Sequence, residues 1–127
     1  MADNLTNTAE NRALDWLMGN TSTAPTTPLK LALVTANGSD STAGTEVTGG
    51  SYARKTVACN ASVNGATSNS ADIVFTGMPP CTVVGVEIWD SAGTPIRWWW
   101  GALDASRTVA AGDELRITAA SLALSLS

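Results

Sequence analysis

The sequence predicts a mostly β protein, an antiparallel β-sandwich or small barrel of about seven strands behind one N-terminal helix. Three observations lead to this expectation. From residue 29 onward, large apolar residues recur with the period of two that is typical of strands. Short apolar runs are separated by turns rich in Gly, Pro, Asn and Asp, without helical stretches between them. The length of 127 residues suits one domain.

An amphipathic helix is expected at residues 6–18. Apolar side chains recur there at helical spacing, together with one residue a turn earlier: Leu5, Ala9, Ala13, Trp16 and Leu17. Gly19 follows, and glycine readily takes the left-handed conformation that ends a helix. The stripe needs a partner surface, which either the same domain or a neighbouring subunit could supply.

Residues 21–28, TSTAPTTP, predict a linker. The stretch contains two prolines and no large apolar residue, so we expect it to be extended and weakly attached. The chain is accordingly divided into a helix arm at 1–20, a linker at 21–28 and a β-sandwich domain at 29–127.

Seven segments have the composition of strands. They are residues 29–34, 52–59, 73–75, 81–89, 94–103, 115–119 and 122–126. The pair 81–89 and 94–103, joined by a short turn, is the clearest hairpin. The last segment, LALSL, is almost without charge and would promote aggregation at an exposed edge. It therefore lies inside a sheet or beneath another subunit.

The run IRWWWG at residues 96–101 raises a question about packing. Successive side chains of a strand point to opposite faces, so Trp98 and Trp100 lie on one side and Trp99 on the other. We expect Trp100 in the core of its own domain. For Trp98 and Trp99, the core and a subunit interface both remain open, since tryptophan is enriched at interface centres.

Charge and composition exclude several functions. The formal net charge is −4 and only 14% of residues are charged, so no basic patch for nucleic acid is expected. The chain has no histidine, which removes the usual general base and the common zinc ligand sets. Asp104 and Asp113 fit turn capping better than a catalytic pair. We expect no enzyme activity and no catalytic, cofactor or metal site.

Two further expectations concern targeting and redox state. The polar start and the lack of an apolar run of ~20 residues predict no signal peptide or membrane span, so we expect a protein that is cytosolic at synthesis. Cys59 and Cys81 form no CxxC pair. They are interpreted as reduced residues, although spacing alone does not exclude a disulfide.

Several phrases resemble a family of small bacteriophage virion proteins that are commonly labelled tail fibre proteins. The resemblance runs from about residue 8 to 126, and its most specific pieces are GTEV at 44–47, GGSYAR at 49–54, WGAL at 100–103 and AGD at 111–113. The turn DSAG at 90–93 is shorter than the family usually shows. The resemblance implies a virion structural protein.

Within the GTEVTGGSYAR motif, the glycines permit a sharp and left-handed path into the following strand. Glu46 and Arg54 are its only opposite charges. We predict that they pair across the base of the loop, while two separately solvated side chains are the alternative.

The expected function is therefore that of a virion component. The first interpretation is a capsid cement or decoration protein that stabilises the head lattice through oligomeric contacts, as a trimer bound to the major capsid protein. The alternative is a tail or tail-fibre component that attaches to glycans on the host surface. Interface candidates are Leu5, Trp16, Leu17, Trp98 and Trp99.

Overall fold

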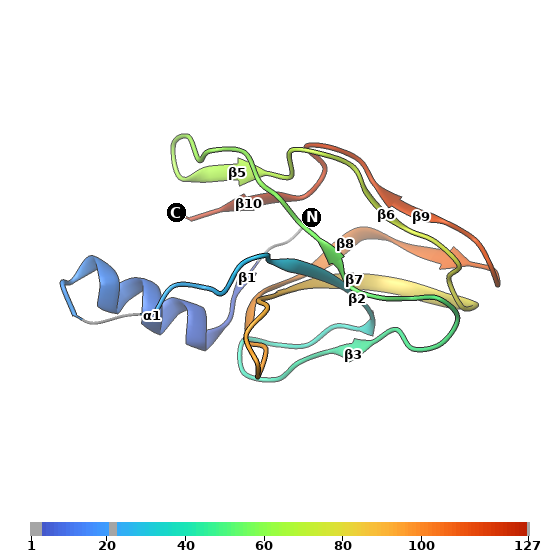
Figure 1. Cartoon of the computed structure of the whole chain (residues 1–127), viewed down its shortest axis with the longest axis horizontal. Coiled ribbons are helices and arrows are strands. Elements are labelled where there is room, and N and C mark those ends of the chain that lie inside the picture. The colour runs from blue at the N-terminus through green and yellow to red at the C-terminus, as the bar shows by residue number, and fades with distance from the viewer. Residues whose placement is uncertain (1–3, 21–22, 127) are drawn as a thin grey trace.

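The computed structural model describes residues 4–20 and 23–126, and Figure 1 shows their arrangement. The elements are β1 (Asn4–Leu5), α1 (Asn7–Leu17), β2 (Lys30–Ala36), β3 (Thr45–Glu46), β4 (Lys55–Thr56), β5 (Ala66–Ser68), β6 (Ile73–Phe75), β7 (Cys81–Trp89), β8 (Arg97–Val109), β9 (Leu115–Ile117) and β10 (Ala123–Ser125). The protein is mostly β with one short N-terminal helix, as predicted.

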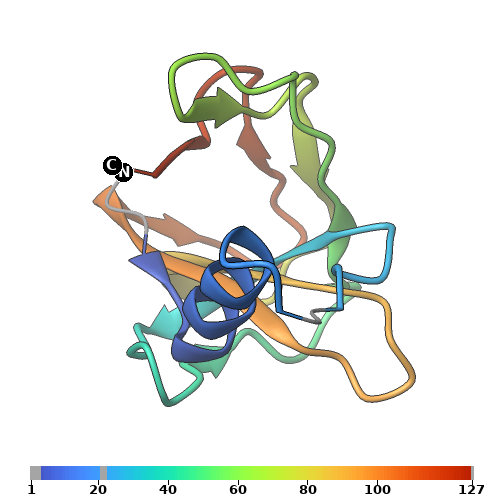
Figure 2. The same ribbon diagram turned by 90° about the vertical axis from the view of Figure 1, so that its left-hand side faces the viewer.

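The largest sheet of the described residues is antiparallel and has the order β1-β8-β7-β2-β3, with β4 also paired to β2. Two short ribbons, β5 with β10 and β6 with β9, complete the β structure. The ribbons lie over one face of the large sheet, and α1 lies at one end of the molecule (Figure 2). The layers are sandwich-like, and no closed barrel forms in the described part of the chain.

The hydrophobic core lies between the large sheet and the ribbons. Its completely buried side chains include Leu31 and Leu33 from β2, Val83 from β7 and Phe75 from β6. Leu122, just before β10, is also fully buried. Alternate residues of each strand thus converge on one apolar layer, as the period of two predicts.

The hairpin β7–β8 is the longest pairing and confirms the predicted partner of segment 81–89. Its register runs from Cys81 opposite Val109 to Trp89 opposite Arg97. The predicted end of the second strand at residue 103 is wrong, because β8 resumes pairing after an irregularity at residues 103–106. Apolar residues no longer alternate after that irregularity, because the rest of β8 is largely exposed. The sequence pattern therefore could not indicate that the strand continues.

The last strand obtains a partner within the chain. The predicted strand segments leave out residues 60–72, but β5 lies there and pairs with β10. Leu122 and Leu124 are buried. Conversely, the predicted strand 52–59 is reduced to β4. The two-residue strands β1 and β3 carry no periodic pattern long enough to be found from sequence.

The GTEVTGGSYAR loop turns through two glycines in the left-handed region. Gly49 has a φ of 103° and Gly50 a φ of 56°. A Cβ atom at Gly50 would lie 2.5 Å from the carbonyl oxygen of Gly77. Both the conformation and the close backbone approach therefore require glycine, as the motif predicts.

The helix and the spacer are attached to the large sheet. The Thr6 N–H donates to the Trp98 carbonyl over 3.1 Å, and the Thr6 side chain caps α1. Residues 21 and 22 of the predicted linker are outside the described residues, but Thr26 exchanges backbone and side-chain hydrogen bonds with the turn at Asp90 and Ser91. The spacer is thus held more firmly than its composition predicts. Within 4–20 and 23–126, no helix is long and apolar enough to cross a membrane.

Candidate interaction surfaces

The three consecutive tryptophans face two different layers. Trp99 is paired with the buried Ile88 and packs against the hydrophobic core. Trp98 is on the opposite side, only 7% exposed, beneath α1. Trp100 is half-buried, and its indole N–H donates to Asp40 Oδ1 over 2.8 Å. The expectation that Trp100 fills the core is therefore wrong, because the register gives that place to Trp99.

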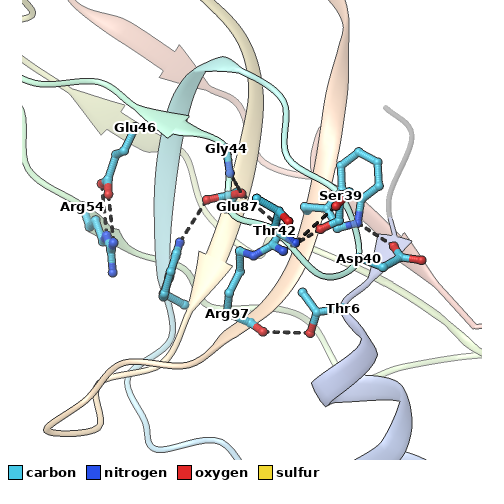
Figure 3. Close-up of polar contacts among 11 residues, drawn as sticks. Thr6, Ser39, Asp40, Thr42, Gly44, Glu46, Arg54, Glu87 and Arg97 are labelled. Atoms are coloured by element: carbon cyan, nitrogen blue, oxygen red, sulfur yellow. Dashed lines mark hydrogen bonds and ion pairs between the residues drawn. The ribbon is translucent and has the colours of Figure 1, made fainter.

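A buried ion pair lies on the same outer face of the sheet. Glu87 is 1% exposed and Arg97 is 8% exposed. Arg97 Nη1 donates to Glu87 Oε2 over 3.2 Å, and Arg97 Nη2 donates to the Ser39 carbonyl over 2.5 Å. The Gly44 N–H also donates to Glu87 Oε2, over 2.8 Å (Figure 3). Trp89 contributes an indole N–H to the other oxygen of Glu87 at 3.3 Å.

This pair connects a polar loop to the sheet. Ser39 and Gly44 flank the loop that includes Asp40, and both hydrogen-bond to the pair. Two buried charges are tolerated only when their hydrogen-bonding capacity is met. Among the described residues, no buried side-chain nitrogen or oxygen lacks a partner. The loop 39–44 is therefore held in one conformation over the outer face.

The loop pair Glu46 and Arg54 is formed in the structure. Arg54 donates to Glu46 through Nη2 and Nε, at 2.8 and 3.0 Å. The Tyr52 hydroxyl donates to Glu46 over 2.7 Å and accepts from the Leu33 N–H over 3.0 Å. The Arg54 guanidinium also stacks on Trp89, 4.4 Å from the ring centre. The pair thereby ties the motif to β2 and to the hairpin β7–β8.

These contacts change the acidity of the Glu46 carboxyl. Burial alone would raise the pKa of Glu46, but hydrogen bonds from Arg54 and Tyr52 and the charge of Arg54 outweigh it and lower the pKa. Burial raises the pKa of the Tyr52 hydroxyl, which therefore stays protonated and acts as the donor. Glu46 consequently favours the ionised form in the folded chain.

We expect Glu46→Gln and Arg54→Gln to destabilise the fold non-additively, with a coupling of about 1 kcal/mol in a double-mutant cycle, since both groups are partly exposed and screened. A lowered folded-state pKa gives stability above the unfolded-state value and loses it as the pH falls. The deficit of Glu46→Gln should therefore shrink in acid, below the ordinary carboxyl pKa of 4.5. Urea unfolding at several pH values measures both effects. Additive losses or a deficit that is constant with pH would contradict the pairing.

The outer end of α1 is apolar and exposed. We call Leu14, Trp16, Leu17 and Met18 the helix patch. Each of these side chains is at least 60% exposed, and Trp16 reaches 71%. Leu14, Leu17 and Met18 share a helix face at spacings of three and four residues. The sequence predicted the apolar stripe of the helix, but within the chain only Ala9 of α1 is buried.

An apolar groove adjoins the helix patch. This helix groove has a volume of about 420 Å³ and lies between α1, residues 23–25 and the start of β8. Its walls include Trp16, Trp98 and Trp99, with Leu5 and Leu126 at its sides. Arg12 stacks over Trp98 at 5.3 Å and closes one side. Trp16 belongs to both the helix patch and the wall of the helix groove, and both lie at this end of the molecule.

The predicted interface residues therefore separate into two groups. Trp16 and Leu17 are exposed in the helix patch, and Leu5 is half-buried at the groove. Trp98 and Trp99 are packed mainly within their own chain. Sequence reasoning overlooked Leu14 and Met18. It also overlooked Glu87. This residue is the one carboxylate in the apolar strand CTVVGVEIW, and the next strand of the hairpin begins with an arginine, so the pattern could have indicated a buried ion pair.

The described residues contain no cluster suited to metal binding. No group of three or more Cys, Asp or Glu side chains is placed to hold an ion in residues 4–20 and 23–126. Cys59 and Cys81 are free thiols, so the alternative of a disulfide between them is not realised. Burial raises the pKa of both thiols, which disfavours the reactive thiolate.

Comparison with known protein families identifies a match for this chain. The family model described as "Podophage GP4 fiber I protein gp80" matches residues 4–125, which is nearly the whole chain. The comparison with curated proteins found no match. The family match confirms the resemblance to phage fibre proteins that the sequence motifs indicated.

Proposed function

This chain belongs to the family of podophage GP4 fiber I proteins, and on that basis we propose that it is a tail-fibre component that contributes to attachment at the host surface. The single observation that supports this proposal is the family match over residues 4–125. A phage fibre protein is a structural protein of the virion. Attachment to the host is the step that this proposal adds to that structural role.

The fibre interpretation replaces capsid cement as the preferred function. Small size, a β body and low charge suit both roles, so the sequence alone favoured the capsid on general grounds. The family description refers to a fibre and gives no support to a place on the head lattice. Of the two functions considered, the alternative of a tail or fibre component fits better.

Self-association is the second part of the proposal. The helix patch exposes four large apolar side chains beside an apolar groove, which is unusual for a solitary soluble domain. Burying one such side chain contributes about 1.5–3 kcal/mol. Fibres are built from repeated copies of a chain. In a trimer, each of the three copies would bury its own helix patch against a neighbour. The patch therefore anchors the chain to further copies of itself within the fibre.

The proposal assigns the chain a binding and structural role without catalysis. Its net charge of −4 does not favour nucleic acid, and no histidine is present to act as a base. The partners are other copies of the chain, neighbouring tail proteins and the host surface. No cofactor is invoked.

Two measurements test this function. Antibodies against the chain should label the tail region of intact particles in electron microscopy, and the copy number per virion should be small. Purified protein should compete with the phage for adsorption to its host, whereas heat-unfolded protein should not. Labelling spread over the head would overturn the fibre assignment, and absence of competition would overturn the role in attachment.

A further inference from the structure

A second pocket lies where the start of α1, the loop 39–44 and the turn end of the hairpin β7–β8 meet. Its volume is about 380 Å³, within the range of about 300–1,000 Å³ that is typical of ligand sites. Its lining includes the half-buried Trp89 and Ile96, with Asn7, Asp40 and Ser41 exposed around them. The pocket is thus open to solvent and has an apolar base.

Two polar groups of this pocket, the Asp40 carboxylate and the Arg97 guanidinium, are held in position by hydrogen bonds. The Asp40 carboxylate accepts from the Trp100 indole N–H at 2.8 Å, marked by the dashed line at Asp40 in Figure 3. The backbone carbonyl of Asp40 accepts from the backbone N–H of Asn7 at 3.0 Å. Arg97 supports the base of the pocket through the buried pair with Glu87. Preorganised polar groups bind a ligand without the entropy cost of ordering them.

The charge of the pocket argues against an anionic ligand. The positive charge of Arg97 is compensated by Glu87 at 3.2 Å, and its other arm is engaged by the Ser39 carbonyl. The remaining charge at the opening is the carboxylate of Asp40. The Asp40 carboxylate would repel a phosphate or a carboxylate. Hydroxyl groups, by contrast, can donate to Asp40 and accept from the side-chain amide of Asn7.

We infer that this pocket binds a neutral saccharide of the bacterial surface. Such a ligand combines hydroxyl groups, which suit Asp40, Asn7 and Ser41, with apolar C–H faces, which suit the surface of Trp89 and Ile96. This inference rests on the proposed attachment function and names its site and ligand class. The sequence did not indicate the site, because its residues come from three separate segments.

The test uses an array of bacterial surface polysaccharides, followed by titration calorimetry with an oligosaccharide prepared from the best-bound polysaccharide. Ser41→Trp would fill the opening and Asn7→Ala would remove one polar partner. We expect each to weaken binding at least about tenfold. Asp104→Asn serves as the matched control, since Asp104 is an exposed carboxylate in a different groove, and should bind like the unchanged protein. Circular dichroism verifies that each variant is folded.

Two results would overturn the inference. One is binding that survives both Ser41→Trp and Asn7→Ala, or is lost in Asp104→Asn. The other is the absence of saccharide binding by a protein that still competes for adsorption, which would leave the attachment function intact and point to another kind of receptor. If the protein neither competes nor binds any saccharide, the attachment function and this site are both rejected.

Discussion

Arg97→Met will lower the free energy of unfolding by about 3–5 kcal/mol, the usual cost of leaving a buried charge without its partner. The substitution keeps much of the side-chain volume but removes the guanidinium. Glu87, 1% exposed, then keeps hydrogen bonds from the N–H groups of Gly44 and Trp89 but has lost its paired guanidinium. The Ser39 carbonyl also loses its donor. Urea unfolding followed by circular dichroism measures the loss.

Another arginine, which is exposed, provides the control for this prediction. Arg116 forms ion pairs with Asp72 and Glu114 but is 48% exposed, so Arg116→Met should unfold close to the unchanged protein. Adding Glu87→Gln to Arg97→Met should cost less than the sum of the two single losses, because the second change removes the uncompensated charge. Equal losses for Arg97→Met and Arg116→Met would show that the pair does not hold the sheet and the loop together.

Leu17→Ser will weaken self-association by about tenfold to a hundredfold per interface. This follows from the removal of about 1.5–3 kcal/mol of apolar burial, where each 1.4 kcal/mol changes an equilibrium tenfold. Leu17 is 68% exposed and contributes little to the core of its own chain, so the fold should remain intact. Sedimentation velocity over a range of protein concentrations measures the change.

The matched control for this prediction is Asn11→Ser, a change to the same residue type at an exposed polar position of the same helix. It places the same side chain at a polar position of the helix and should leave the assembly unchanged. Trp16→Ser should act in the same direction as Leu17→Ser. An unchanged protein that sediments as a monomer at all concentrations, or a Leu17→Ser variant that assembles normally, would contradict the role of the helix patch.

The two predictions concern different parts of the same architecture. The ion pair between Glu87 and Arg97 gives one face of the sheet a fixed polar cover, which shapes the pocket near Asp40. The helix patch lies on α1, whose start is held to β8 through Thr6. A variant of the helix patch should therefore lose assembly and keep saccharide binding, and a variant of the pocket should do the opposite.

Much of the local structure was predictable because it depends on neighbours in the chain. The helix, the hairpin β7–β8 and the left-handed glycines at 49 and 50 follow from side-chain period, turn composition and the freedom of glycine. The charge pair of Glu46 with Arg54 was also predictable, since both residues belong to one short motif. The same motif carried the resemblance to phage fibre proteins.

Longer-range features depended on register and packing. Alternation placed Trp98 and Trp99 on opposite faces, but only the pairing of Trp99 with Ile88 decided which face is the core. The partner of β10 was unpredictable because β5 has three residues and no distinctive pattern. The pocket near Asp40 likewise unites three distant segments.

By itself, then, the sequence determined the mostly β class, the N-terminal amphipathic helix, the fibre family and the shortage of catalytic groups. The tertiary structure alone decided that Glu87 and Arg97 meet in a buried pair and that Trp16 and Leu17 remain exposed. The physical reason is that periodicity records which side chains share a face. Which face is buried depends on free energies of contact between segments far apart in the chain.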